Sequence, residues 1–168
     1  MIRCGIGYDV HRFAEGRKLI LGGVEIAHPR GLEGHSDADV LSHAMADALL
    51  GAIGAGDIGQ HFPNIDESFR GISSLEILRR VTKLLATKNA RVVNIDATVL
   101  AEEPTLAPHV AAMRRMIADA IGVSGSNVSV KATTNESLGA IGRGEGIAAI
   151  AIATVELVER DRRARRKS

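Results

Sequence analysis

Apolar and polar residues follow two different periods along the first third of the chain. Residues 2–13 alternate well enough for a strand, and residues 18–21 and 24–26 are expected to form a second strand or a hairpin around a Gly-Gly pair. Over about residues 37–53, apolar side chains recur at helical spacing, and Ser36 stands in the position of an N-cap. The pattern predicts strands followed by a helix.

The rest of the chain alternates between the same two periods. A Ser-Ser-Leu-Glu capping box opens a predicted helix over residues 73–88, and a further helix is expected over about 105–121. Strands are predicted at 91–101, 127–133 and 147–159. This order of elements predicts an α+β fold, a single domain whose mixed β-sheet is backed by helices on one face.

Two features of this layout bear on function. The segment 54–72 is a long Gly-rich loop, and such loops in compact domains are usually functional or mobile. It contains a Gly-x-Gly-x-x-Gly run that is not expected to bind a dinucleotide, because a helix and not a strand precedes it. The last strand is apolar on both faces, so it should be buried on both sides, which favours a subunit interface.

Charge is distributed unevenly between the domain and its C-terminal tail. Of 21 basic and 20 acidic residues, six basic and one acidic fall within residues 160–168, which leaves 15 and 19 in the domain, residues 1–159. The tail could touch nucleic acid or anionic lipid, but a solvated, disordered end is the simpler expectation. Aromatic residues are only 2% of the chain and no basic face is evident, so nucleic acid is not an expected partner.

The location is inferred from what the chain lacks. Cys4 is the only cysteine, which rules out an intrachain disulfide and fits a reducing compartment. The N-terminus has no apolar run typical of a signal peptide, and the longest apolar stretch, residues 147–155, is too short to cross a bilayer. We expect a soluble, cytoplasmic protein without a membrane partner.

Three residues from two predicted elements could bind a metal. Asp9 and His11 are two apart on a strand, so their side chains share a face, and His43 lies on the first helix. Two histidines and a carboxylate leave one coordination position open, as in catalytic zinc sites. Asp39 or Asp47, on the same helix face as His43, could orient its ring. A solvated strand face and a buried, hydrogen-bonded histidine are the alternative interpretation.

Two segments in the last third of the chain could approach a ligand. Residues 131–136, Lys-Ala-Thr-Thr-Asn-Glu, offer hydroxyls, backbone N–H groups and a carboxylate that could hold phosphate and Mg²⁺. Residues 139–146 are Gly-rich, so their backbone could lie close to a ligand or another subunit. Ordinary polar turns remain the alternative for both.

These pieces occur together with further motifs in a specific order. The motifs are residues 7–13 (Gly-Tyr-Asp-Val-His-Arg-Phe), residues 34–44 (Gly-His-Ser-Asp-Ala-Asp-Val-Leu-Ser-His-Ala), residues 56–59 (Gly-Asp-Ile-Gly), Phe62 with Pro63, residues 131–134 with Glu136, and residues 142–148 (Gly-Arg-Gly-Glu-Gly-Ile-Ala). Over residues 2–155 they resemble the signature of the 2-C-methyl-D-erythritol 2,4-cyclodiphosphate synthase family. The resemblance implies that 4-diphosphocytidyl-2-C-methyl-D-erythritol 2-phosphate is converted to the 2,4-cyclodiphosphate with release of CMP, in the non-mevalonate isoprenoid pathway.

The same resemblance implies metals and an assembly. Asp9, His11 and His43 would bind a divalent metal, usually zinc. Glu136 would bind a second cation, Mg²⁺ or Mn²⁺, between the α and β phosphates. The family forms homotrimers with sheets around a threefold axis and active sites between subunits, and an apolar cavity near Arg143 on that axis could hold an isoprenoid diphosphate.

The resemblance also assigns substrate contacts. His35 and Thr134 match catalytic positions that stabilise the transition state. A first group of implied contacts combines the substrate contacts Asp9 and His11 with residues on the methylerythritol phosphate side: His35, Ser36, Asp57, Ile58, Gly59, Phe62, Pro63, Asn64, Ile65 and Asp66. The remaining implied contacts, including the cytidine pocket, are Ala101, Glu102, Glu103, Pro104, Thr105, Leu106, Ala107, Ala132, Thr133, Thr134, Asn135, Glu136, Ala140 and Arg143. Asn64, Thr105 and Ala140 depart from residues common in the family, which bears on substrate contacts and not on the reaction.

Two other functions are compatible with the same residues. A zinc hydrolase of phosphoesters or amides would use the same three ligands, but it would need a carboxylate placed to activate a metal-bound water. A trimeric binding protein could use its basic tail to hold nucleic acid without any catalysis.

Overall fold

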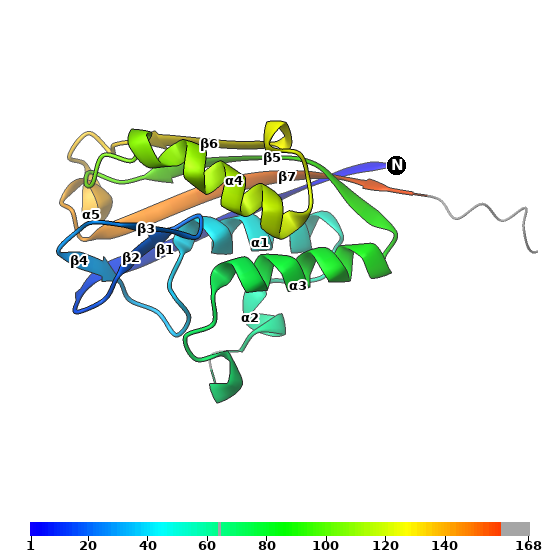
Figure 1. Ribbon diagram of the computed structural model, residues 1–168, viewed down its shortest axis with the longest axis horizontal. Helices are drawn as coiled ribbons and strands as arrows, with labels where there is room; N and C mark the ends of the chain where they lie inside the picture. The colour runs from blue at the N-terminus through cyan, green and yellow to red at the C-terminus, as the bar shows by residue number, and fades with distance from the viewer. Residues whose placement is uncertain (64, 159–168) are drawn as a thin grey trace, which may run out of the picture.

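The computed structural model describes residues 1–63 and 65–158. Five strands form one sheet in the order β4-β1-β7-β5-β6, and β2 and β3 form a separate hairpin (Figure 1). The strands are β1 (Ile2–Glu15), β2 (Leu19–Leu21), β3 (Val24–Ile26), β4 (Arg30–Leu32), β5 (Ala90–Leu100), β6 (Val128–Thr133) and β7 (Gly146–Leu157). The α-helices are α1 (Val40–Ala52), α2 (Ile58–His61), α3 (Ser74–Thr87), α4 (Val110–Ile121) and α5 (Gly139–Gly142). The 3-10 turns are η1 (Glu67–Phe69), η2 (Ala107–His109) and η3 (Gly125–Asn127).

The sheet is built around two long antiparallel strands. β1 and β7 pair from Ile2 opposite Glu156 to Arg12 opposite Gly146. β5 pairs antiparallel with the other side of β7, whereas β5 and β6 are parallel and α4 lies between them in the chain. A parallel pair needs such a crossover. The predicted α+β class and mixed sheet are confirmed.

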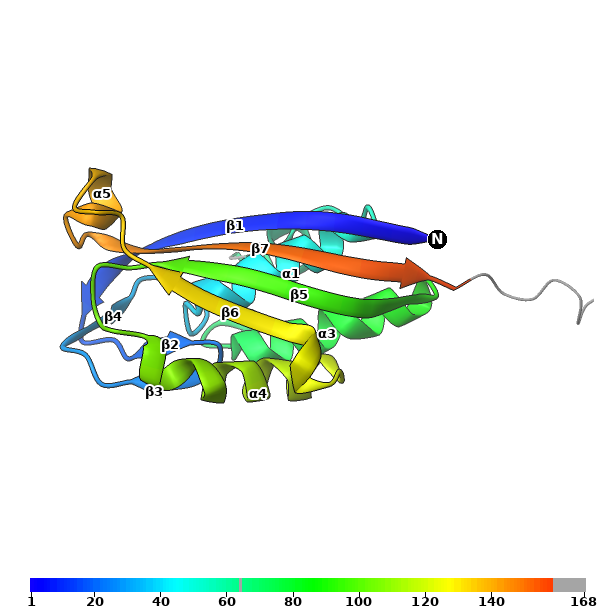
Figure 2. The ribbon, with the colours of Figure 1, turned by 90° about the horizontal axis from the view of Figure 1, so that it is seen from above.

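Helices cover one face of this sheet, as the sequence predicted. In Figure 2 the long strands lie in front and α1 and α3 lie behind them. α1 packs on β1 and β7. Its fully buried side chains include Leu41, Met45 and Leu49. Gly5 and Gly7 of β1 leave room for the α1 backbone to lie directly against the strand.

The other face of the sheet is open, and it is apolar over β1 and β7. Ile6 pairs with Ile152 and Tyr8 with Ile150, and these four side chains are 69%, 49%, 57% and 39% exposed, respectively. The single chain therefore covers only one side of the last strand, and burial of the other side in a subunit interface stays a prediction. Contiguous exposed apolar residues of this kind mark an interaction surface.

The first helix begins later than predicted. Ser36 is not its N-cap, because Asp39 accepts the capping hydrogen bond from the Ser42 backbone N–H at 3.1 Å. Ala38 has a φ of 58°, so the helix cannot extend back through it. The Ser36 hydroxyl instead accepts a hydrogen bond from the Ala38 N–H at 3.1 Å in a local turn.

Several other boundaries differ from the prediction. β4 was missed, α2 and η1 interrupt the segment 54–72, and α5 follows β6. The helix expected over 105–121 is shorter. α4 begins at Val110 after the turn η2, ends at Ile121 and is followed by Gly122, whose φ is 77°. Ser73 is the N-cap of α3, but its side chain makes no capping hydrogen bond.

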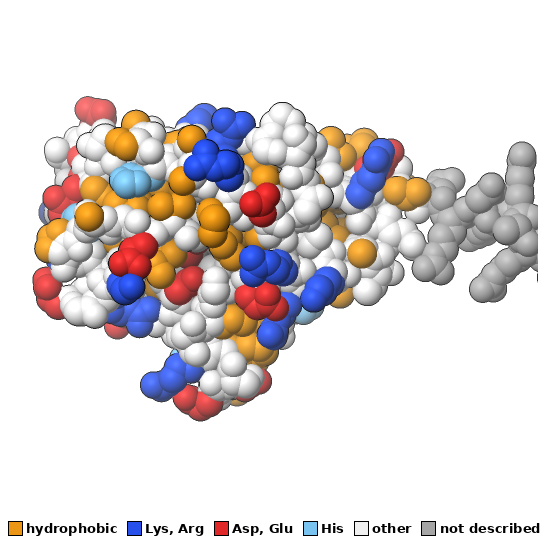
Figure 3. Space-filling view, in the orientation of Figure 1, with side chains coloured by type: hydrophobic (Ala, Val, Ile, Leu, Met, Phe, Trp, Pro, Cys, Tyr) orange, Lys and Arg blue, Asp and Glu red, His pale blue; other side chains and the backbone are white. Residues whose placement is uncertain are grey.

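Some predictions concern the surface or residues that the structure does not describe. The described helices include none with the length and apolar character needed to span a bilayer. On the face drawn in Figure 3, Lys and Arg side chains are interspersed with Asp and Glu and form no continuous basic area. Cys4 is an exposed free thiol, and the cytoplasmic location stays a prediction. Asn64, the domain boundary at residue 159 and the tail 160–168 lie outside the described residues.

Candidate metal centre and active site

Asp9, His11 and His43 meet where β1 lies against α1. Asp9 Oδ2 is 2.9 Å from His11 Nε2 and 3.0 Å from His43 Nδ1, and the two ring nitrogens are 3.2 Å apart. One ligand atom from each residue lies within 4.8 Å of the others, so the three are placed to bind a metal. The predicted convergence of a strand carboxylate and two imidazoles is confirmed.

His11 turns Nε2 toward this centre because its other ring nitrogen is fixed. Nδ1 is hydrogen-bonded to the backbone carbonyl oxygen of Glu33. A carbonyl oxygen only accepts, so Nδ1 carries the hydrogen and donates it. In the neutral ring, Nε2 is then the nitrogen with the free lone pair, and it lies beside Asp9 and His43.

The three groups perturb one another electrostatically. Burial would raise the pKa of Asp9, but hydrogen bonds and charge from His11 and His43 outweigh burial and hold that pKa well below its usual range. Burial would lower the pKa of His11, but the hydrogen bond and charge of Asp9 outweigh it and raise that pKa. The centre therefore keeps a carboxylate and favours a cation beside it.

The donor chemistry of the centre fits a divalent metal. A carboxylate oxygen and ring-nitrogen lone pairs this close repel one another unless a proton or a metal ion lies among them. One carboxylate and two imidazoles are ligands that zinc accepts, and three protein ligands leave a fourth position for a substrate. The residues present therefore match a catalytic site and not a closed structural one.

His43 is supported from behind by two hydroxyl groups. Its Nε2 lies 2.9 Å from Ser74 Oγ, at the N-terminus of α3, and 3.1 Å from Ser36 Oγ. Both serine side chains are buried. Ser74 was not among the candidate residues, because a serine opening a predicted helix gives no sign of a distant imidazole.

The carboxylates expected to orient His43 have other partners. Asp39 accepts hydrogen bonds from the backbone N–H groups of Gly22 and Gly23, at 2.9 and 2.8 Å. Asp47 accepts one from the backbone N–H of Ile58 at 2.7 Å. The prediction that Asp39 or Asp47 orients the ring is therefore wrong. Both carboxylates instead fix neighbouring loops onto α1.

A cavity of about 240 Å³ opens beside the three ligands. The apolar wall of this cavity comes from α2, η1, α3 and the residues next to them: Ile58, Phe62, Phe69, Ile72 and Ile77. His35 and Ser36 also line it, and His35 Nε2 is buried without a hydrogen-bond partner among the described residues. A buried polar atom of this kind is normally satisfied, so a bound ligand can supply its partner.

The cavity brings together the first group of predicted contacts. Seven of them line it, together with the metal ligand His43: Asp9, His11, His35, Ser36, Ile58, Gly59 and Phe62. Asp57, Pro63, Ile65 and Asp66 lie in the same segment but do not line it. Phe69, Ile72 and Ile77 were missed. Phe69 was a usable signal, because the chain has only three phenylalanines and this one stands in a polar stretch.

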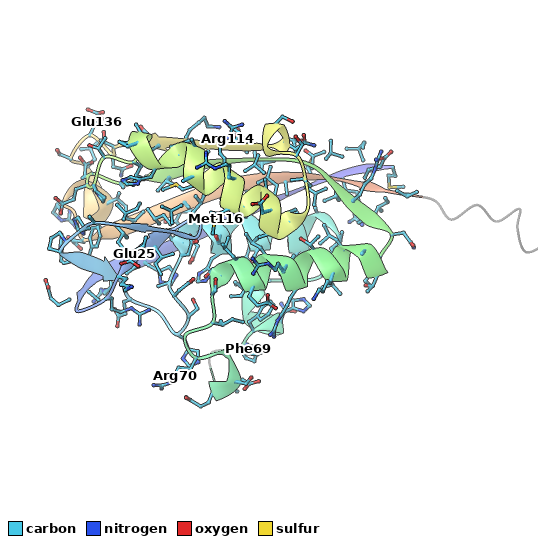
Figure 4. All side chains as sticks on the ribbon, in the orientation of Figure 1. Glu25, Phe69, Arg70, Arg114, Met116 and Glu136 are labelled. Carbon is cyan, nitrogen blue, oxygen red and sulfur yellow. The ribbon has the colours of Figure 1, made fainter. Side chains whose placement is uncertain are left out.

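The second group of predicted contacts lies elsewhere in the chain. Neither the loop 101–107 nor the segment 132–136 lines this cavity, and Glu136 is not part of the metal-binding cluster found among the described residues. Figure 4 shows Glu136 at the end of the molecule near α5 and Phe69 on the loop that protrudes on another side. One chain therefore holds two separate halves of the predicted site.

Glu102 and Glu136 shape this second half. Glu102 Oε1 accepts hydrogen bonds from the backbone N–H groups of Asn135 at 2.8 Å and Ser137 at 3.3 Å. Glu136 Oε1 accepts one from the Thr134 hydroxyl at 3.0 Å. Glu136 and Ser137 have φ values of 50° and 61°, a conformation that non-glycine residues rarely adopt. Glu102 thus holds in place a loop with a strained backbone, and Glu136 lies in that loop.

A second cavity, of about 490 Å³, lies where β1 meets α5 and the start of β7. It is lined by Phe13, Ala140 and Glu145 among others, and His11 borders both cavities. Arg143 donates a hydrogen bond from Nε to Glu145 Oε1 at 2.6 Å. Of the predicted contacts in the second half, Ala140 lies at this cavity.

The sequence model of the YgbB family matches residues 2–156. The chain belongs to this family. Two curated relatives named 2-C-methyl-D-erythritol 2,4-cyclodiphosphate synthase, from Alkaliphilus metalliredigens and Chlorobium luteolum, are each 59% identical to the chain. The matches cover 92% of this chain and 97% and 99% of those proteins, respectively.

Solved structures share the fold of this YgbB-family chain. The bifunctional IspDF from Campylobacter jejuni aligns with a TM-score of 0.91 at 40% identity, over 95% of this chain and 43% of that one. IspF from Plasmodium falciparum, solved as a CDP complex, aligns with a TM-score of 0.82 at 33% identity, over 94% and 97%. The family that the motifs indicated is confirmed.

Proposed function

We propose that this chain converts 4-diphosphocytidyl-2-C-methyl-D-erythritol 2-phosphate to 2-C-methyl-D-erythritol 2,4-cyclodiphosphate and releases CMP. The observation that carries the proposal is the convergence of Asp9, His11 and His43 beside a cavity. Curated relatives that are 59% identical to the chain bear the name of this activity.

The reaction is an intramolecular phosphoryl transfer. The 2-phosphate oxygen bonds to the β-phosphorus, the bond from that phosphorus to the α-phosphate oxygen breaks, and CMP leaves with the electron pair. Both reacting groups are anionic, so charge repulsion is the main barrier. A divalent cation bound by Asp9, His11 and His43, most suitably zinc, supplies charge neutralisation and alignment. The phosphate nucleophile is already ionised near neutral pH, so no general base is required.

His35 and Ser36 have the geometry to bind the methylerythritol phosphate portion. Both line the cavity next to the metal ligands, and His35 Nε2 needs a partner. The apolar wall with Phe62 and Phe69 excludes water from the reacting groups. Holding the two ends of one molecule together in this way can be worth about 7–11 kcal/mol in favourable cases.

The proposed active site is completed by a second copy of the chain. The metal ligands and the predicted cytidine residues lie apart in one chain, while the sheet face with Ile6, Tyr8 and Ile152 is open and apolar. We propose a homotrimer with these faces around the threefold axis. The loops 101–107 and 132–136 of one subunit would then bind CMP beside the metal site of its neighbour. We also propose that an isoprenoid diphosphate binds near Arg143 on this axis.

A charge on the open sheet face should dissociate this assembly. Ile152→Lys would bury an ammonium group in an apolar interface, which is strongly unfavourable. We expect a monomer by light scattering, with loss of CMP release. Met116→Lys is the control, because Met116 is 41% exposed but lies on α4, on the helical side (Figure 4). A trimeric Ile152→Lys protein would contradict the proposed interface.

Glu136 is proposed to bind Mg²⁺ or Mn²⁺ between the α and β phosphates. Glu136→Gln keeps the shape of the side chain but removes the charge that attracts a hard cation. At constant Zn²⁺, we expect the Mg²⁺ concentration that gives half-maximal CMP release to be at least roughly tenfold higher than for the wild type. Glu67→Gln, which changes an exposed glutamate paired with Arg70, is the control. An unchanged Mg²⁺ titration would remove Glu136 from the site.

Product analysis tests the function as a whole. The purified protein is incubated with the proposed substrate, Zn²⁺ and Mg²⁺, and the products are separated by mass. Equal amounts of CMP and a cyclic diphosphate support the synthase. A hydrolase would instead add water and give an open-chain product, and that outcome would replace the proposal.

A further inference from the structure

The N-terminus of α3 reaches the rear of the metal centre through one buried hydroxyl. Ser74 is fully buried, and its Oγ lies 2.9 Å from His43 Nε2. The Asp37 carboxylate holds Ser74 at two points: it accepts the Ser74 hydroxyl at Oδ1 and the Ser74 backbone N–H at Oδ2, the latter at 2.9 Å. Asp37, Ser74 and His43 therefore form a continuous hydrogen-bonded chain that ends at a metal ligand.

Backbone hydrogen bonds hold the segment that contains Asp37 beside the segment that leads to Ser74. The Asp37 N–H donates to the Ile72 carbonyl oxygen at 3.1 Å, and the Gly71 N–H donates to the His35 carbonyl oxygen at 2.9 Å. These bonds join the segment before α1 to the segment before α3. The position of Ser74 behind His43 is thus set by the fold and does not depend on a bound metal.

Which group donates and which accepts in each of these hydrogen bonds follows from the chemistry of the partners. The Asp37 carboxylate can only accept, so the Ser74 hydroxyl donates its hydrogen to Asp37. The Ser74 oxygen then offers only lone pairs to His43, so Nε2 must carry a hydrogen and donate it. In a neutral ring, Nδ1 is left unprotonated, and Nδ1 is the nitrogen that lies 3.0 Å from Asp9.

We infer that Ser74, oriented by Asp37, is a positioning residue that fixes the Nε2–H form of His43 and so directs its Nδ1 lone pair at the metal. The inference rests on the proposed metal site and adds two residues to the machinery that holds it. Hydrogen bonds of this kind to the second nitrogen of a ligating histidine fix ring orientation and raise ligand basicity.

The same arrangement assigns a direction to the Ser36 hydroxyl. Ser36 Oγ accepts the Ala38 N–H at 3.1 Å and faces the hydrogen on His43 Nε2 at 3.1 Å. Neither partner takes the hydrogen of Ser36. Because Ser36 lines the cavity, that hydrogen is available for donation to a substrate oxygen. Ser74 thereby orients the metal ligand His43 and leaves the hydroxyl hydrogen of Ser36 free to be donated to the substrate.

Metal affinity tests the inference without turnover. Zn²⁺ binding to metal-stripped protein is measured by competition with a chelating dye for the wild type, Ser74→Ala, Asp37→Asn and Ser73→Ala. We expect Ser74→Ala to weaken Zn²⁺ binding by about 10–100-fold, and Asp37→Asn to weaken it in the same direction. Ser73→Ala is the matched control, because Ser73 is the adjacent residue and its side chain makes no capping hydrogen bond. Unchanged Zn²⁺ affinity in folded Ser74→Ala would overturn the inference.

Nitrogen-15 NMR of the Zn²⁺-loaded protein supplies a readout that a purely structural role would not change. In the wild type we expect Nδ1 of His43 to be the coordinating nitrogen and the Nε2 hydrogen to exchange slowly, and in Ser74→Ala we expect that exchange to be faster. Coordination through Nε2 in the wild type would overturn the inference even if the variants fail to fold. A protein with this Zn²⁺ dependence that releases no CMP would refute the proposed function and leave the inference standing.

Discussion

His43→Ala is expected to abolish CMP release while leaving the chain folded. The substitution removes one of three metal ligands and leaves Asp9 and His11 to hold the cation alone. Metal-ion catalysis contributes several kcal/mol of transition-state stabilisation, and each 1.36 kcal/mol is tenfold in rate, so the loss should reach about 10³-fold or more. The expected rate loss reflects the missing cation and not a missing proton transfer, because the nucleophile is already ionised.

The measurement combines activity, metal content and folding. CMP release is followed in the presence of Zn²⁺ and Mg²⁺, bound Zn²⁺ is measured after dialysis, and circular dichroism with thermal unfolding reports the fold. Asp9→Ala removes a ligand that lies on β1 instead of α1, and it should give the same result. His109→Ala is the control, since it removes a histidine that is not part of the metal-binding cluster found among the described residues. Full activity in metal-free His43→Ala protein would refute the role of the centre.

The metal ligands could be predicted because each depends on a local period. Asp9 and His11 share a strand face at a spacing of two, and His43 lies within a helical pattern, so the side-chain directions follow from sequence. Their meeting at one point depends on how β1 crosses α1. That crossing is a tertiary property. The residue types raised a metal site as one interpretation, and the family motifs favoured it before the structure did.

The residues that orient these ligands could not be predicted in the same way. Asp39 and Asp47 share a helix face with His43, so local spacing favoured them, yet both bind backbone groups of other loops. Ser74 lies 31 positions beyond His43 in the chain and reaches it only because α3 packs beside α1. Side-chain support that crosses between elements leaves no periodic trace in the sequence.

The apolar strand β7 shows a related limit. Its sequence, apolar on both faces, predicted burial on both sides, but the single chain covers only one side. Ile150 and Ile152 remain partly exposed on the other. The pattern therefore does not distinguish a strand face that the chain covers itself from a face that it leaves exposed. In the proposed trimer, neighbouring subunits would cover that second face and bring the second half of the predicted site beside the first.

Gly7→Ala is expected to destabilise the fold more than any surface substitution. A Cβ at this position would overlap the carbonyl oxygen of Ala44 and lie 2.7 Å from the backbone nitrogen of Ala48, both in α1. These atoms belong to a helix backbone and cannot move aside as a side chain would. Overpacking typically costs about 1–3 kcal/mol and occasionally more, and contact with rigid backbone should place this variant at about 3 kcal/mol or above.

For a chain of 168 residues, such a loss should lower the melting temperature by about 6–12 °C. Gly125→Ala is the matched control, because a Cβ there would meet nothing within 4 Å and the backbone is not left-handed. Since β1 carries Asp9 and His11 while α1 carries His43, any shift that relieves the overlap also separates the metal ligands. Gly7→Ala protein that does fold should therefore bind Zn²⁺ more weakly than Gly125→Ala. Wild-type stability together with wild-type Zn²⁺ affinity would show that the contact between β1 and α1 does not position the centre.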